Sequence, residues 1–196
     1  MVSQSANNPL FGPDLDWENN AFIHLTSDEW WPYISGYAKA AEILSDHVQS
    51  GSRDRDTLIY PIVFLSRHYL ELLMKRTLLD AQDLLRRDRN LPGHHDLARL
   101  WRDLRPLILT LYRTDPPADL ARLDSVVTSL TELDRCSFAF RYPVDKRGAM
   151  SLPNELTLVN IRRFSDTFRE AVALLDVIQS GIAAQLEVRN ELEHDV

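Results

Sequence analysis

One stretch of the sequence decides the fold: residues 56–79, which read DTLIYPIVFLSRHYLELLMKRTLL. From Leu58 to Leu72, apolar residues recur every three or four positions, which is the period of an α-helix with one buried face. Pro61 falls in the early turns of this pattern, where a helix tolerates proline. The stretch therefore predicts a long helix from about residue 56 to about residue 87.

A second face of the same helix carries Arg67, Glu71 and Lys75, each four residues after the last. Alternating charges at this spacing form ion pairs that stabilise an isolated helix by about 0.2–0.5 kcal/mol each. The simplest interpretation of Glu71 and Lys75 is an exposed surface pair. They become candidates for a ligand site only if they point into the same cleft as His95 and Arg141.

Four more helices are predicted on either side of this one. Their approximate ranges are 28–49, 96–114, 117–135 and 154 to beyond 186. Asp96 is the expected N-cap of the helix that follows it, and Pro106 is expected to kink that helix or split it. Asn154 is the expected cap of the last helix, with Leu158 on its buried stripe. The sequence thus predicts an all-α, up-and-down helical bundle of about five main helices.

Length and periodicity indicate one domain. The chain has 196 residues, which is within the usual size of a single domain, and no internal repeat is evident. Residues 28–196 are expected to form one bundle. Residues 1–27 show turn chemistry without periodicity, so we expect an irregular segment that packs on the body through Trp17, Phe22 and Ile23.

Charge and cysteine content limit the classes of function. The net charge is −7, and the 22 basic residues are 3 lysines and 19 arginines. A generally basic nucleic-acid surface is therefore excluded, and any nucleic-acid contact is confined to a small arginine-bearing groove, because the arginine fork suits phosphate. The single Cys136 excludes an internal disulfide and any metal site that needs several cysteines.

Metals, cofactors and membranes are not expected from the motifs present. Glu191-x-x-His194 is one copy of a motif that di-iron bundles need twice, so neither a metal nor a cofactor is expected. No secretory signal is visible, and no stretch approaches about 18 uncharged apolar residues. We therefore expect a cytoplasmic protein that does not associate with a membrane.

Three segments follow one another along the chain in a recognisable order. They are Phe64–Leu79 with Glu71-x-x-x-Lys75, then His94-His95-Asp96-Leu97, and then Phe140-Arg141-Tyr142-Pro143. A helix with Glu-x-x-x-Lys, a His-Asp-Leu helix start and an Arg-Tyr-Pro loop before a final helix together resemble the HEPN domain (higher eukaryote and prokaryote nucleotide-binding). The resemblance covers about residues 56–186.

This resemblance implies a helical bundle that often dimerises, so a homodimer is expected. Many HEPN members are metal-independent ribonucleases of bacterial toxin–antitoxin or defence systems, and such an enzyme needs an inhibitory protein partner. Their catalytic motif is an arginine, often followed directly by a polar residue, and a histidine, with four to six residues between the arginine and the histidine. Arg189, Asn190 and His194 are similar to this motif and are, by that resemblance, the candidate catalytic residues.

The two charged members of this motif have suitable chemistry for RNA cleavage. On a helix, positions five apart lie within about 140° of each other around the axis, so Arg189 and His194 can border one groove. A histidine can take the proton of the RNA 2′-hydroxyl, while an arginine holds the phosphate and stabilises its developing charge. In-line attack would then leave a 2′,3′-cyclic phosphate without a metal.

A second function remains open: a non-catalytic module that binds a nucleotide or a protein partner. Its candidate residues are Glu71, Lys75, His95, Asp96, Arg141 and Tyr142. Structural roles compete with this interpretation, because His95 can belong to a capped turn and Arg141 can pair with a carboxylate while Tyr142 packs on Pro143. A third interpretation is a dimeric helical interaction protein without a ligand.

Overall fold

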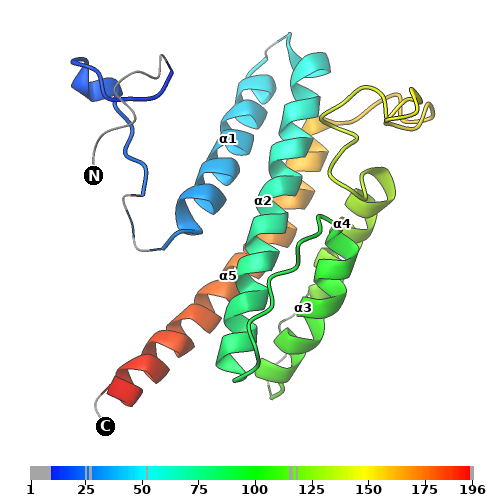
Figure 1. The fold of residues 1–196 in the computed structure, drawn as a ribbon. Coiled ribbons are helices and arrows are strands. Elements are labelled where there is room, and N and C mark those ends of the chain that lie inside the picture. Colours follow the sequence, from blue (N-terminus) through cyan, green and yellow to red (C-terminus); the bar gives the residue numbers. More distant parts are fainter. Residues whose placement is uncertain are drawn as a thin grey trace.

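In the part of the chain that the computed structural model describes, the regular elements are five α-helices and one short 3-10 turn (Figure 1). The structure describes residues 10–24, 26, 28–51, 53–114, 117 and 119–194. The helices are α1 (Trp31–Gln49), α2 (Arg55–Leu84), α3 (Leu97–Leu111), α4 (Leu120–Leu133) and α5 (Ile161–His194). The predicted all-α bundle of five main helices is confirmed.

Helix α2 lies at the centre of the bundle and packs against α1, α3 and α5, while α4 packs against α3 and α5. Figure 1 shows one connection that interrupts the alternation of helix directions. After α2, residues 85–96 run back along the helix, so that α3 starts beside the middle of α2 and runs in the same direction. This return segment places His95 next to residues near the centre of α2, although 24 positions separate it from Glu71.

Two predicted helix details differ from the structure. The last helix begins at Ile161 rather than near Asn154, and its cap is Asn160, whose Oδ1 accepts a hydrogen bond from the amide of Arg163 at 2.9 Å. Leu158, expected on the buried stripe, therefore precedes the helix and is 90% exposed. Helix α3 continues through Pro106 without splitting, because burial of the surrounding leucines outweighs the one amide hydrogen bond that proline removes.

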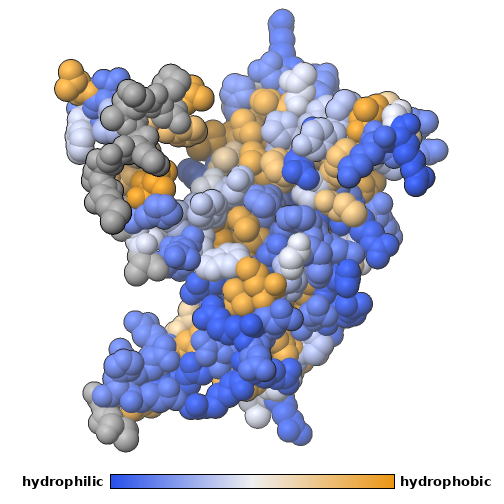
Figure 2. Space-filling model, viewed as in Figure 1, coloured by the Kyte–Doolittle hydropathy of each residue, from blue (hydrophilic) through white to orange (hydrophobic). Residues whose placement is uncertain are grey.

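The N-terminal segment does not bury its apolar side chains in the described residues, contrary to expectation. Trp17, Phe22 and Ile23 are largely exposed, and Trp17 meets Phe22 edge-on rather than the bundle. Apolar atoms are visible on this segment in Figure 2. Asp14 and Asn20 close a local turn through paired hydrogen bonds of 2.8 and 2.9 Å, so this turn is held by contacts within the segment.

The charged ladder of α2, interpreted from the sequence as an exposed pair, is buried. Arg67 is 0% exposed and Glu71 is 1% exposed. The guanidinium of Arg67 donates from Nη1 to Glu71 Oε2 at 3.1 Å, from Nε to the carbonyl of Asp134 at 3.1 Å, and from Nη2 to the carbonyl of His95. One side chain therefore ties α2 to the segment before α3 and to the end of α4.

Helix α5 qualifies the expectation about membranes. By length and composition it is apolar enough to cross a membrane, with a mean hydropathy of 1.4 over its most apolar window, 28% of which is buried. Core helices of bundles also pass this test, and Leu175, Ile178 and Ile182 of α5 are buried against the other helices. Asp176, in the same stretch, accepts a hydrogen bond from the hydroxyl of Tyr69 at 2.6 Å, and burial raises the pKa of this carboxyl.

We predict that Arg67→Ala strongly destabilises the fold. The substitution removes the partner of Glu71 Oε2 in the core and two links to backbone carbonyls. This change costs about 3–5 kcal/mol in the free energy of unfolding. Urea denaturation followed by circular dichroism measures the loss. Arg102→Ala is the control, because Arg102 is exposed and, among the residues that the structure describes, its side chain pairs only with its neighbour Asp103. A loss for Arg67→Ala no larger than for Arg102→Ala contradicts the prediction.

Candidate functional site

Glu71 is the centre of a polar cluster on one side of α2. Its Oε1 accepts hydrogen bonds from Lys75 Nζ at 2.9 Å and from His95 Nδ1 at 2.7 Å, while Oε2 faces Arg67. Burial by itself raises the pKa of this carboxyl, but the hydrogen bonds and charges of Lys75 and His95 outweigh it, so the pKa of Glu71 is lowered. The carboxylate stays ionised and can orient both partners.

His95 is the exposed member of the cluster. A carboxylate only accepts hydrogen bonds, so Nδ1 of His95 is protonated and donates this hydrogen bond to Glu71. The imidazole is 57% exposed, which leaves Nε2 available on the solvent side. A histidine oriented through one nitrogen by a buried carboxylate, with the other nitrogen open, is a common arrangement at binding and catalytic sites.

Asp96, also predicted as a ligand-binding residue, has a structural position. Its Oδ1 caps α3 by accepting from the amide of Arg99 at 3.1 Å, and its Oδ2 accepts from Arg135 Nε at 3.0 Å. The predicted N-cap is therefore confirmed. Both carboxylate oxygens are engaged, and the cap fixes where α3 starts and hence where the neighbouring His95 lies.

His68 belongs to the same surface, although the sequence analysis did not single it out. It lies three residues before Glu71, stacks on Phe64 with centroids 5.9 Å apart, and meets Tyr37 of α1 edge-on at 4.4 Å. Burial lowers the pKa of His68 and favours the neutral imidazole. The available signal was its spacing, because residues three and four apart share a helix face.

Arg141 approaches this surface from the loop between α4 and α5. Its guanidinium lies 5.5 Å from the ring centroids of both Phe64 and Tyr142, and its Nε donates to the carbonyl of Ser137 at 2.6 Å. Within the described part of the chain no carboxylate pairs with Arg141, so the expected ion pair is not formed there. Tyr142 is half-exposed and stacks on Phe138 with centroids 4.7 Å apart.

These side chains form one continuous strip along α2. We name it the His95 face and define it by six residues: Phe64, His68, Glu71, Lys75, His95 and Arg141. Ring contacts link Arg141 to Phe64 and Phe64 to His68, while hydrogen bonds link Glu71 to Lys75 and His95. Glu71 and Lys75 thus join His95, as one part of the sequence-based condition requires. Arg141 lies beside Phe64, about two turns of α2 before Glu71, and lines a separate cavity.

The predicted catalytic residues lie elsewhere, at the far end of α5. Arg189 donates from Nη1 to the carbonyl of Asp83 at 2.7 Å and from Nη2 to the carboxylate of Asp83 at 2.8 Å. Nδ1 of His194 donates to the carbonyl of Asn190, 2.9 Å away. The guanidinium is thus used to hold α5 against the end of α2 rather than presented to a ligand.

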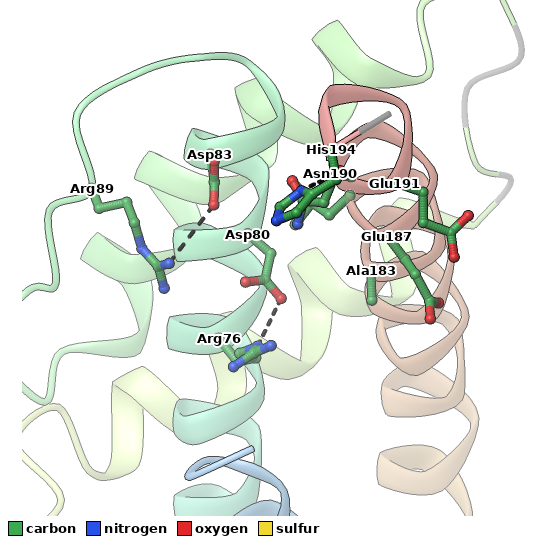
Figure 3. Close-up of a pocket in the computed structure, with 10 residues that line it drawn as sticks. Arg76, Asp80, Asp83, Arg89, Ala183, Glu187, Asn190, Glu191 and His194 are labelled. Carbon is green, nitrogen blue, oxygen red and sulfur yellow. Dashed lines mark hydrogen bonds and ion pairs between the residues drawn. The ribbon is translucent and has the colours of Figure 1, made fainter. Parts of the chain in front are cut away.

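His194 and Asn190 line an open cavity of about 990 Å³ between α2 and α5 (Figure 3). Figure 3 shows both side chains turned toward α2. Four carboxylates share the lining, Asp80, Asp83, Glu187 and Glu191, against two arginines, Arg76 and Arg89. Each arginine is paired with one of these carboxylates, Arg76 with Asp80 and Arg89 with Asp83. The cavity therefore has an acidic excess, which opposes a phosphate group.

No family model, curated protein or solved structure matches this chain. Among the described residues, no group of three or more His, Cys, Asp or Glu side chains is arranged to hold a metal ion. The argument for function therefore rests on the geometry of the His95 face and on the sequence motifs.

We predict that the Glu71 network makes the protein sensitive to acid. The pKa of Glu71 is lowered in the folded state, so its stabilisation is fully present above the unfolded pKa of about 4.3 and is lost as the pH falls through the folded pKa. Urea denaturation between about pH 6 and pH 3 measures this slope. Glu71→Gln should flatten it, whereas the control Glu132→Gln, at an exposed position, should keep it. Equal slopes in both variants contradict the prediction.

We also predict that Arg189→Ala loosens the end of α5. Without the two contacts to Asp83, the amides of residues 185–194 should exchange with deuterium severalfold faster, because little else buries this end of the helix. Hydrogen–deuterium exchange with mass spectrometry measures the effect. Arg163→Ala removes an exposed arginine near the other end of α5 and should leave this region unchanged. Unchanged exchange in Arg189→Ala would show that the contact does not hold the helix.

Proposed function

We propose that this protein is a HEPN-like helical module that binds the phosphate groups of a nucleotide or RNA at the His95 face. The observation that carries the proposal is the 2.7 Å hydrogen bond between His95 Nδ1 and the buried carboxylate of Glu71, which leaves Nε2 open to solvent. The buried carboxylate of Glu71 thus orients the exposed imidazole of His95. Such an arrangement suits a ligand contact better than a surface of freely rotating side chains.

Two cationic groups of the His95 face suit an anion. When protonated, His95 donates from Nε2, and Arg141 offers its terminal nitrogens, because the only hydrogen bond of its side chain in the described residues is made through Nε. Lys75 carries a further positive charge and donates a hydrogen bond to Glu71 Oε1. Phosphate, with several acceptor oxygens, is the ligand group that matches these donors.

Aromatic groups beside Arg141 suit the base of the same ligand. Tyr142 is half-exposed and already stacks on Phe138, so its outer side is available for a further flat ring. Base stacking on aromatic side chains contributes about 1–3 kcal/mol per base. A nucleotide therefore fits the combination of donors and rings better than inorganic phosphate does.

Metal-independent RNA cleavage by Arg189 and His194 is the second candidate function. It is favoured by one observation, that His194 and Asn190 line the same cavity of about 990 Å³. The engagement of Arg189 by Asp83 and the acidic lining weigh against it. Incubation of RNA with the protein in EDTA decides the matter, since cleavage that is lost in His194→Ala supports an enzyme and equal inactivity of both proteins argues against one.

The remaining expectations stay proposals, and all but the cytoplasmic location follow from the HEPN resemblance. These are a homodimer, an inhibitory protein partner, a role in bacterial defence or toxin–antitoxin systems, and a cytoplasmic location. A non-catalytic module has no need of an inhibitory partner. An inhibitory partner is therefore expected only if the protein is a ribonuclease.

We predict that UMP and ATP raise the thermal stability of the protein through the His95 face. A ligand at about 100 times its dissociation constant stabilises a protein by about 2.7 kcal/mol. Differential scanning fluorimetry should show a rise in Tm for the wild type and a much smaller one for His95→Ala and Arg141→Ala. His47→Ala, an exposed histidine near the end of α1, is the control and should respond like the wild type. No rise in wild-type Tm at millimolar nucleotide would refute the proposal.

A further inference from the structure

A second cavity, of about 880 Å³, lies at the end of the bundle where α1 meets α2 and where α5 begins (Figure 1). Three arginines line it: Arg53 from the turn before α2, Arg55 at the start of α2, and Arg162 in the first turn of α5. We name this cavity the arginine groove. Arg162 comes from a part of the chain far from Arg53 and Arg55, so no sequence motif brings all three together.

The arginine groove brings three positive charges together with little acidic counterpart. Within the described part of the chain, the side chains of Arg53, Arg55 and Arg162 form no ion pair or hydrogen bond. Asp56 is the one acidic residue of the lining, which leaves an excess of two positive charges. In a protein with a net charge of −7, this local excess is opposite in sign to the whole.

Two long helices add to the positive potential of the arginine groove. Helix α2 starts at Arg55 and has 30 residues, and α5 starts at Ile161 and has 34. The first residues of both line the groove, so the positive ends of both helix dipoles face it. The arginines and the cavity carry the inference, and the helix ends strengthen it.

An exposed tyrosine connects the arginine groove with the surface around Arg141. Tyr60 is 48% exposed and lines both the groove and a neighbouring cavity of about 480 Å³. That second cavity also contains Arg141 and Tyr142. Arg141 in turn lies over Phe64, the first residue of the His95 face. Arginines and aromatic rings thus alternate along one path from the groove to the His95 face.

We propose that the arginine groove binds the phosphodiester backbone of a single-stranded nucleic acid, whose other end occupies the His95 face. The inference rests on the proposed function for that other end, and it makes the ligand a short oligonucleotide rather than a mononucleotide. Arg53, Arg55 and Arg162 hold phosphates, while Tyr60 and Tyr142 stack on bases. A single strand is required, because only unpaired bases present their faces to such rings.

The path favours a nucleic acid over an acidic peptide. Both ligands carry negative charges, but a peptide of glutamates has no flat rings for Tyr60 and Tyr142. Backbone contacts by arginine combined with stacking on aromatic side chains are the recurring features of proteins that bind single strands. The groove is also small, which agrees with the expectation that any nucleic-acid contact in this acidic chain is confined to a local site.

Fluorescence anisotropy with a labelled polyuridine of about eight nucleotides tests the inference. The test variant is Arg53→Ala/Arg55→Ala/Arg162→Ala, and the control Arg87→Ala/Arg99→Ala/Arg113→Ala removes the same charge from exposed arginines outside the groove. We expect the Kd of the test variant to rise at least tenfold and that of the control less than twofold. Three lost phosphate contacts should also lower the slope of log Kd against log salt by about 2. The test variant should keep its wild-type circular dichroism, because the three side chains are exposed and unpaired.

The outcomes separate this inference from the proposed function. If UMP binds through His95 but the groove variant keeps its affinity for polyuridine, the inference is overturned and the proposed function stands. If polyuridine binding depends on the groove arginines while UMP does not raise the Tm through the His95 face, the groove is supported and the proposed function fails. If polyglutamate of equal charge binds as tightly as polyuridine, or if Tyr60→Ala leaves polyuridine binding unchanged, the assignment to nucleic acid is overturned.

Discussion

The buried guanidinium of Arg67 is the constraint on which the rest of the structure depends. A charge without solvent needs partners at each donor, and Arg67 finds them on α2 itself, on the segment before α3 and at the end of α4. Because two of these partners are backbone carbonyls, the positions of those loops are fixed and not only their side chains. The return segment along α2 and the start of the loop between α4 and α5 are thus held against the same helix.

The same network gives the site its geometry. Glu71 balances Arg67 on one oxygen and orients His95 on the other, so the structural side of the cluster and the proposed ligand-binding side share one carboxylate. Glu71 therefore cannot be changed to probe binding without loss of stability. His95 and Arg141, which are exposed, allow the two roles to be separated. The buried core of the bundle, and not the loops, holds the side chains of such a site in place before a ligand binds.

The charge of the molecule is unevenly distributed between the two ends of the bundle. The end of α5 near His194 lies beside four carboxylates, whereas the beginnings of α2 and α5 meet at three unpaired arginines. The net charge of −7 is a sum over the whole chain and does not reveal this difference between the two ends. The acidic end opposes phosphate where the catalytic motif was predicted, and the basic end attracts it where no motif was seen.

The sequence by itself determined the helices, because apolar periodicity and the capping residue Asp96 are local signals. It also singled out Glu71, Lys75, His95 and Arg141 as candidate ligand-binding residues, with Glu71 and Lys75 included only if they share a cleft with the other two. It did not determine that the Arg67 ladder is buried, because the same spacing of charges occurs on exposed and on buried helix faces. Nor did it show that Asp83 occupies Arg189 or that Arg53, Arg55 and Arg162 meet. Those facts depend on which helix ends lie side by side, and only the tertiary packing decides that.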